Sequence, residues 1–342
     1  MGPIAPPLIE WFEANKRLLP FRQEPSAYHI WVSEIMLQQT RVSAALPYYE
    51  RFIAALPDPA ALAACDADTL HRLWQGLGYY NRVNNMQKAA RIVCEQYGGA
   101  LPADYDALRA LPGIGEYTAG AIASIAFGLP APAVDGNVLR VFARLYDDDA
   151  DITRPETRRL FTARVLEQMP KTSPGPYNEA LMELGALVCL PNGAPQCSVC
   201  PLAALCRGRA SGRAERLPTK PAPKAKEPQH ITVALVQSGQ GLLLQRRPSR
   251  GLLAGLWQPA AFEGELTRQQ LAAKLAELGV TVEFAASLPP AKHVFTHKIW
   301  LLGGWRGTAA PVPLPDGWAW GSVQEYAVPS AFEAYVGQAR PT

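Results

Sequence analysis

Four cysteines lie within 18 residues of this chain, and they constrain the fold more than any other feature. They follow the spacing C-x7-C-x2-C-x5-C, at Cys189, Cys197, Cys200 and Cys206. Four such thiolates can complete the coordination of a zinc ion or of an iron–sulfur cluster, and the spacing leaves both open. Six cysteines in 342 residues are too few for a disulfide scaffold. We therefore expect a metal or cluster site in a reducing compartment.

The apolar pattern predicts two domains of different class. From residue 8 to 205, apolar residues recur at helical spacing, in 27–40, 83–96, 117–127, 134–146, 157–168 and 177–189. After residue 230 the pattern predicts short strands and one helix: strands at 231–236, 242–245, 282–286 and 298–303, and a helix over 267–278. We expect an all-α domain over 1–206, an extended linker over 207–229 and a small α+β domain over 230–342.

The basic charge of the chain is concentrated in one segment. Residues 207–230 hold seven Lys or Arg against two Glu, a net +5, which leaves −2 for the rest of a chain whose net charge is +3. The segment is either a phosphate-binding patch or a solvated linker, and charge alone favours the linker. No secretory signal is visible in Met1–Glu10, and the longest mainly apolar stretch, Ala119–Phe127, is too short to span a bilayer. We expect a cytoplasmic monomer with no membrane partner.

Two glycines open one of the apolar helices. Gly113 and Gly115, in the sequence Leu-Pro-Gly-Ile-Gly, precede the helical pattern that begins at Tyr117. Backbone N–H groups at such a helix start can bind a phosphate. An ordinary tight turn explains the two glycines equally well.

Two carboxyl groups are candidates for catalysis. Glu34 stands within an otherwise apolar helix, where burial raises a carboxyl pKa and allows general-acid chemistry near neutral pH. The alternative is an exposed Glu in a first helical turn. Asp135, in Val-Asp-Gly-Asn-Val, is either an active-site carboxylate or the N-cap of the next helix.

Taken together, five segments strongly resemble the adenine DNA glycosylase family of helix-hairpin-helix enzymes. They are W-x-S-E-x-M-L-Q-Q-T (31–40), G-L-G-Y-Y (76–80), L-P-G-I-G-x-Y-T-A (111–119), V-D-G-N-V (134–138) and the cysteine array. The resemblance runs from about Leu8 to Cys206. It continues more weakly through the C-terminal domain, which resembles the MutT-like Nudix fold.

The resemblance implies removal of adenine mispaired with 8-oxoguanine, or with guanine, in double-stranded DNA after base flipping. Glu34 is then the general acid that protonates the adenine, and Asp135 stabilises the cationic sugar, with or without a covalent intermediate. Asn137 hydrogen-bonds within the site and Tyr117 contacts Asp135. The similar endonuclease III family carries a Schiff-base Lys where this chain has Tyr117, so we expect a monofunctional glycosylase.

The family pattern also implies the DNA contacts. It assigns Arg22 and Glu179 to the adenine pocket, Gly113 and Gly115 to a DNA phosphate, and the remaining substrate contacts to Leu37, Gln38, Gln39 and Tyr79. Gln39 and Tyr79 are expected to insert around the orphaned base as a wedge.

In the family the four cysteines bind one [4Fe–4S] cluster. The first spacing here is seven residues, where the family has six, and the loop 190–196 has no Lys or Arg for a DNA phosphate. Arg207 and Arg209, just beyond, could take that part. In the C-terminal domain only Glu277 matches the Nudix carboxylates, so pyrophosphatase activity is not expected. The segment Phe295-Thr296-His297 corresponds to the family's loop that reads 8-oxoguanine.

Three other functions are alternative interpretations of the sequence. An endonuclease III-like glycosylase/lyase is opposed by Tyr117 and by the extra domain. A non-catalytic iron–sulfur DNA-binding protein is opposed by the presence of both Glu34 and Asp135. A Nudix hydrolase with a helical appendage is opposed by the missing carboxylates.

Overall fold

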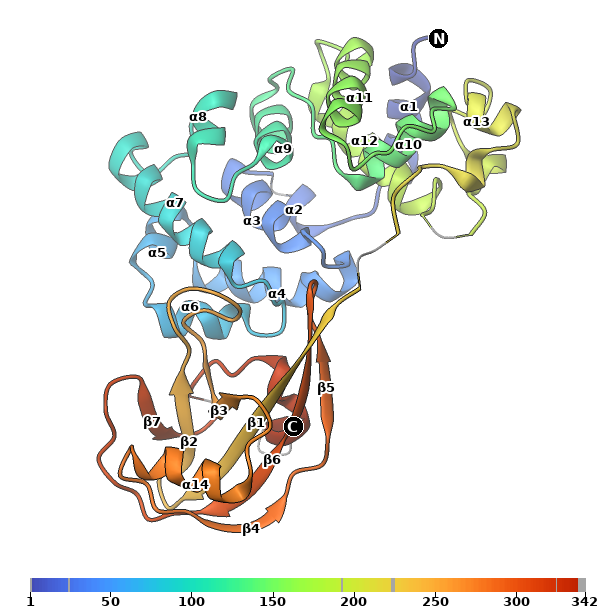
Figure 1. The fold of residues 1–342 in the computed structure, drawn as a ribbon. Helices are drawn as coiled ribbons and strands as arrows, with labels where there is room; N and C mark the ends of the chain where they lie inside the picture. The colour runs from blue at the N-terminus through green and yellow to red at the C-terminus, as the bar shows by residue number, and fades with distance from the viewer. Residues whose placement is uncertain (1, 24, 192, 223–224, 324, 338–342) are drawn as a thin grey trace. The chain divides into compact units, whose positions relative to one another are not determined.

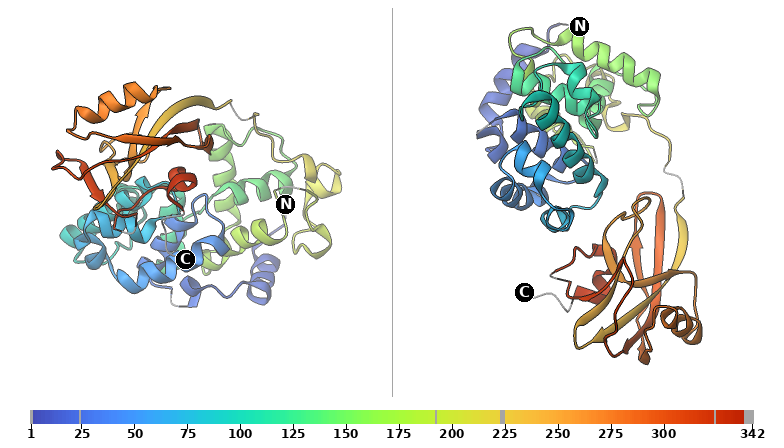
Figure 2. Two further views of the ribbon diagram at one scale, coloured as in Figure 1. Left: turned by 90° about the horizontal axis from the view of Figure 1, so that it is seen from below. Right: turned by 90° about the vertical axis from the view of Figure 1, so that its left-hand side faces the viewer.

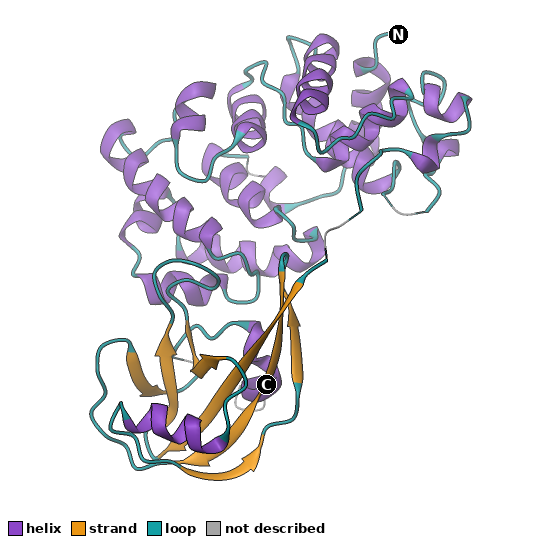
Figure 3. Ribbon diagram, viewed as in Figure 1, coloured by secondary structure: helices purple, strands orange, loops and turns teal. Residues whose placement is uncertain are grey.

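The computed structural model describes residues 2–23, 25–191, 193–222, 225–323 and 325–337 (Figure 1). The chain forms two compact units. The first contains residues 1–64 and 84–222, and the second contains residues 65–83 and 223–342. Each unit is described by itself. Helices dominate up to residue 216, and strands begin at residue 227 (Figure 3).

The helical class predicted for the first part of the chain is confirmed. The helices are α1 (Ala5–Asn15), α2 (Pro20–Gln23), α3 (Ala27–Leu37), α4 (Val42–Ala55), α5 (Pro59–Ala64), α6 (Ala67–Trp74), α7 (Asn81–Tyr97), α8 (Tyr105–Ala110), α9 (Glu116–Phe127), α10 (Gly136–Tyr146), α11 (Pro155–Gln168), α12 (Pro174–Leu187) and α13 (Arg207–Ala210). Side chains cap several helix starts: Ser26 accepts from the backbone N–H of His29, and Asp104 from that of Ala107.

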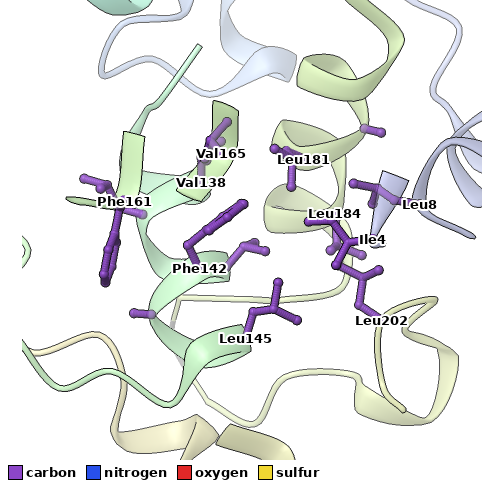
Figure 4. Close-up of a cluster of buried hydrophobic side chains, with 14 of the residues drawn as sticks. Ile4, Leu8, Val138, Phe142, Leu145, Phe161, Val165, Leu181, Leu184 and Leu202 are labelled. Carbon is purple, nitrogen blue, oxygen red and sulfur yellow. The ribbon is translucent and has the colours of Figure 1, made fainter. Parts of the chain in front are cut away.

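Helices α10 and α12 form the centre of one hydrophobic core (Figure 4). Phe142 and Leu184 are fully buried there beside Leu8 of α1 and Phe161 of α11. Burial of each such side chain stabilises the fold by roughly 1.5–3 kcal/mol. The two helices approach closely because Gly185 has no side chain: a Cβ there would lie 2.6 Å from the Cβ of Asn137. The packing of this core thus fixes the start of α10.

The segment expected to be a linker, 207–229, is partly folded. Its first residues form α13, and a Cβ at Gly208 would lie 2.5 Å from the backbone oxygen of Arg144, so this turn packs directly on α10. Leu217 is buried in the same core. Strand β1 already begins at Glu227. The composition of 207–229 did not indicate this packing because the segment contains few apolar residues, whereas its contacts include the close backbone approach at Gly208 and the hydrogen bonds of the Arg213 side chain to Asp147. Residues 223–224 of the expected linker lie outside the described residues.

The second unit is built on one mixed sheet. Its strands are β1 (Glu227–Ser238), β2 (Gly241–Arg246), β3 (Trp257–Glu263), β4 (Glu283–Ser287), β5 (Ala291–Val294), β6 (Lys298–Thr308) and β7 (Trp318–Gly321). The order is β4-β6-β1-β3-β2-β7, with β5 also paired to β6. Strands β1 and β6 run parallel, and the other pairs run antiparallel. The strands predicted at 231–236 and 242–245 lie within β1 and β2, which form a hairpin with Ser238 opposite Gly241.

Helices cover both faces of this sheet (Figure 2). Alternate β1 residues face opposite sides: Ala234 and Val236 pack with α14 (Arg268–Ala276), and Val233 and Leu235 pack with α15 (Glu333–Val336). Thr267 caps α14 in a full capping box. Strands β3, β5 and β7 were not predicted; Pro259 interrupts the pattern of β3, and the other two are only four residues long.

Among the described residues, no helix combines the length and the apolar character needed to cross a membrane.

Candidate active site

One cavity of about 1260 Å³ in the first unit brings the predicted catalytic residues together. Helix α3 contributes Glu34, the start of α9 contributes Tyr117, and the start of α10 contributes Asp135 and Asn137. Other predicted residues also line it: Arg22, Leu37, Gln38, Gln39, Gly115 and Glu179. Segments more than 100 residues apart in the chain therefore converge on one place.

Glu34 is a buried carboxyl group. It lies beyond the first turn of α3 and is only 8% exposed, so the exposed-Glu alternative is wrong. Burial raises the pKa of Glu34 to about 7, and the nearby charges of Asp135 and Glu179 act in the same direction. A hydrogen bond from Tyr117 and the charge of Arg22 oppose this rise. Near neutral pH a substantial fraction of Glu34 thus carries a proton that it can donate.

Asp135 caps helix α10 and also lines the cavity, so its two interpretations from the sequence, N-cap and pocket carboxylate, do not exclude one another. Its Oδ1 accepts the backbone N–H of Val138 at 2.8 Å, and its Oδ2 accepts Asn137 Nδ2 at 2.7 Å. Burial raises the pKa of Asp135, whereas these two donors and the charge of Arg140 lower it. Both donors favour the carboxylate. The pKa of Asp135 is raised overall, but its two donors favour the charge on Asp135, whereas a single donor, Tyr117, favours the charge on Glu34.

The Tyr117 hydroxyl donates to Glu34 Oε2 at 2.5 Å and lies 3.0 Å from Met182 Sδ. We expected a contact with Asp135; the hydroxyl hydrogen-bonds Glu34, and Asp135 acts on Tyr117 through its charge. The first turn of α9 packs against α3, so the ring is directed to the carboxyl on that helix. The hydroxyl stabilises the ionised form of Glu34 and so limits how far its pKa rises.

A hydrogen-bonded chain links Asp135 to the cysteine segment. Arg140 Nη2 donates to Asn137 Oδ1 at 2.9 Å, and Arg140 Nε donates to the backbone oxygen of Cys189 at 2.8 Å. Arg144, one turn further along α10, donates to Cys189 Sγ at 3.2 Å. The sequence analysis missed both arginines. Their signal was their spacing: Arg140 follows Asn137 by three residues and Arg144 follows Arg140 by four, which places all three side chains on one face of a helix.

Family models match both units of the chain. The HhH-GPD superfamily base excision DNA repair protein model matches residues 32–166, and a NUDIX domain model matches residues 232–338. Adenine DNA glycosylase from Homo sapiens is 33% identical over 97% of this chain and 73% of its own length. The enzyme from Rattus norvegicus is 35% identical over 85% of this chain and 67% of its own length.

The chain belongs to the adenine DNA glycosylase family.

It is a base-excision-repair DNA glycosylase, a hydrolase that binds DNA. Among solved structures, a thermostable thymine-DNA glycosylase aligns with a TM-score of 0.55 at 25% identity, over 60% of this chain and 94% of its own. A non-covalent endonuclease III–DNA complex aligns with a TM-score of 0.51 at 26% identity, over 60% of this chain and 92% of its own. The predicted family and fold class are confirmed.

Two arginines and two glutamates form a charged wall of the glycosylase pocket. Arg22 Nε donates to Glu179 Oε1 at 3.0 Å, and Arg22 Nη2 donates to Glu183 Oε2, also at 3.0 Å. Arg17 binds Glu183 through both Nε and Nη2. Glu183 has a side chain only 1% exposed, yet the hydrogen bonds and charges of both arginines hold its pKa at about 2 against the opposing effect of burial. The sequence analysis missed Arg17 and Glu183; the latter follows Glu179 by one helical turn.

The two predicted wedge residues both have left-handed backbones. Gln39 has φ 59° and Tyr79 has φ 48°, a conformation that costs a non-glycine residue of order 1–3 kcal/mol. Gln38, which precedes Gln39 in the chain, donates to Thr118 Oγ1 at 3.3 Å, and Leu37 ends α3 half-buried in the cavity wall. Tyr79 belongs to the segment 65–83 of the second unit.

Gly113, Gly115, Thr296 and His297 are exposed, and Phe295 is half-buried. Gly113 has φ 80° and lies in the turn between α8 and α9, and Gly115 caps α9. Phe295, Thr296 and His297 form the tip between β5 and β6, where the Phe295 ring packs on Trp300. Thr296 is exposed, and within its unit its hydroxyl lies 3.0 Å from that of Tyr79.

The four cysteines are free thiols, each half-buried, and the charges of Cys189, Cys197 and Cys206 all act on Cys200. They are therefore gathered in one region of the first unit. Among the described residues, no three His, Cys, Asp or Glu side chains are arranged to hold a single metal ion. In an iron–sulfur cubane each thiolate binds a different iron, so the thiolates need not converge on one point.

Removing the Tyr117 hydroxyl should change the pH dependence of base release. We expect Tyr117→Phe to raise the Glu34 pKa, because the lost donor stabilised the ionised form. Glu34 is expected to act when protonated, so the rate should fall as the pH rises through about 7. In the variant this fall should occur at a pH higher by up to about one unit. Single-turnover rates from pH 5 to 9 measure this. In the control Tyr177→Phe, the lost hydroxyl bonded a core backbone oxygen, so the limb should stay in place.

Proposed function

We propose that this glycosylase hydrolyses the N-glycosidic bond of adenine paired with 8-oxoguanine, or with guanine. The observation that carries this proposal is the pair Glu34 and Asp135 in one cavity, the first with a pKa of about 7 and the second held by donors that favour its charge. Two carboxyl groups in opposite protonation states are what cleavage through an oxocarbenium-like sugar requires.

The chemistry follows from the positions of these groups. After the adenine leaves the base stack, Glu34 donates its proton to the departing base, and the negative charge of Asp135 stabilises the sugar cation. Asn137 keeps Asp135 oriented through their hydrogen bond. No lysine stands at position 117, so we propose a monofunctional enzyme whose attacking group is water. Arg22 and Glu179, joined by their ion pair, would bind the polar edge of the adenine.

The DNA contacts follow the same reasoning. Gln39 and Tyr79, both exposed on strained backbone, would insert beside the orphaned base, and the N–H groups near Gly113 and Gly115 would bind a phosphate. Thr296 at an exposed hairpin tip would offer its hydroxyl to the N7 proton or the 8-oxo oxygen of the opposite base, with His297 beside it. A second surface must recognise the base opposite adenine, because the adenine itself is identical in damaged and undamaged pairs.

The cysteine segment fits a resident [4Fe–4S] cluster. Cys189, Cys197, Cys200 and Cys206 would hold it, and its part would be structural. Arg144 already donates to Cys189 Sγ, which supports a thiolate at that position.

The main test is a single-turnover assay on duplexes that contain A:8-oxoguanine, A:G or thymine glycol. We expect adenine release from the first two only, without strand cleavage. Asp135→Asn should lower the rate at least ~100-fold, because a neutral amide cannot stabilise the cation. Asn also caps helices, so the fold should persist. Asp104→Asn, at the N-cap of α8, is the matched control and should leave the rate unchanged.

The outcomes separate the rival functions. Release of thymine glycol together with borohydride-trapped enzyme would point to an endonuclease III-like glycosylase/lyase. An Asp135→Asn variant within tenfold of the original rate would refute the role of this carboxylate.

Lesion discrimination should depend on the hairpin tip. Replacing Thr296 and His297 by Ala should narrow the difference in binding and rate between A:8-oxoguanine and A:G duplexes by roughly tenfold, since one discriminating hydrogen bond is worth about 1–3 kcal/mol. The rate on A:G should survive. Thr308→Ala, at the other end of β6, serves as control. An unchanged ratio in the double variant would place lesion reading elsewhere.

The purified protein should be brown and contain about four irons per chain, because four cysteines together complete one such cluster. Metal analysis of protein prepared without oxygen measures this. Stoichiometric zinc with no iron would show that the four thiols bind a single ion instead.

A further inference from the structure

Tyr79 projects from an unusually strained turn between α6 and α7. Its φ is 48°, and the turn also contains Gly76 at φ 106° and Gly78 at φ 69°. Its side chain is 48% exposed. A bulky residue keeps such a backbone only where its surroundings enforce it. The question is therefore which group enforces it.

Arg82, in the first turn of α7, contacts this turn in several ways. Its Nη2 donates to the backbone oxygens of Leu77 at 3.1 Å and of Gly78 at 3.2 Å. Its guanidinium carbon lies 5.2 Å from the ring centre of Trp74 and 5.5 Å from that of Tyr79. One guanidinium therefore touches both the backbone of the turn and the ring that the turn presents.

Trp74 anchors this arrangement. It is fully buried at the end of α6, and its Nε1 donates to the backbone oxygen of Gly78 at 3.0 Å. The oxygen of Gly78 thus accepts from both Trp74 and Arg82. The exposed Tyr79 ring is tied through Arg82 to a side chain that cannot move without disturbing the core.

We propose that Arg82 is the positioning residue of the wedge: it holds the Tyr79 ring in the orientation that enters DNA. This inference rests on the proposed wedge role of Tyr79. A side chain that is already ordered before binding loses less conformational entropy when it inserts into DNA. We do not expect a lysine to replace Arg82, because an ammonium group has no planar face to stack on the rings of Trp74 and Tyr79.

The structure offers one competing explanation. Although it is half-buried, Arg82 could instead bind a DNA phosphate directly, as arginines often do. That role would be independent of the Tyr79 ring and would make binding more salt-dependent. A positioning role requires the effect of Arg82 to disappear when the Tyr79 ring is absent.

A double-mutant cycle separates the two explanations. We would compare the unmodified enzyme, Arg82→Lys, Tyr79→Ala and the double variant on a duplex that carries 2-aminopurine in place of the target adenine, whose fluorescence reports unstacking. Arg82→Lys should slow unstacking about tenfold when Tyr79 is present and less than twofold in the Tyr79→Ala background. Thermal unfolding of each variant confirms the fold.

Two further variants complete the design. Trp74→Phe keeps a ring but loses the donor to Gly78, and it should act in the same direction as Arg82→Lys. Arg91→Lys, also on α7, removes a guanidinium bonded to the backbone oxygen of Ala63, and it should have no effect.

The failures can be told apart. If Tyr79→Ala leaves unstacking unchanged, the wedge role itself fails and the inference falls with it. If Tyr79→Ala is impaired but Arg82→Lys is harmless, or equally harmful in both backgrounds, the wedge role stands and the positioning role of Arg82 is overturned.

Discussion

The catalytic unit depends on the hydrogen bonds that stabilise the buried carboxylate of Asp135. A carboxylate half-removed from water must be compensated, and here the start of α10 compensates it through the N–H of Val138 and the amide of Asn137. Asn137 is in turn held by Arg140, whose guanidinium also binds the backbone of Cys189. The charge of Asp135 is thus stabilised by a hydrogen-bonded chain that extends as far as Cys189.

The same low-dielectric environment gives Glu34 the opposite state. Few donors reach its carboxyl, so burial dominates and its pKa rises to about 7, moderated by Tyr117. One pocket therefore stabilises a proton on one carboxyl group and a charge on another, although the two are the same chemical group. The difference lies in the hydrogen bonds: Asp135 heads a helix, whose free N–H groups favour a negative charge, whereas Glu34 lies inside one.

Strain is placed where the enzyme is proposed to meet DNA. Gln39 and Tyr79 both have left-handed backbones, as do only Asp147 and Leu253 among the other non-glycine residues that the structure describes. At Tyr79 the cost is offset by Arg82 and Trp74, which satisfy the backbone of the turn. The free-energy cost of the strained Tyr79 backbone is thus offset by contacts formed on folding rather than by DNA binding.

The sequence by itself determined the class of each part, the approximate ranges of six helices in the first part and the catalytic candidates, because periodicity and short motifs are local. The Gly-x-Gly turn, Glu34 and Asp135 could all be found in this way. Only the tertiary structure decided that Tyr117 contacts Glu34, that Arg140 and Glu183 belong to the site, and that residues 207–222 pack with the helices. Those contacts join segments far apart in the chain, and their geometry depends on packing such as that at Gly185 and Gly208, which no local pattern records.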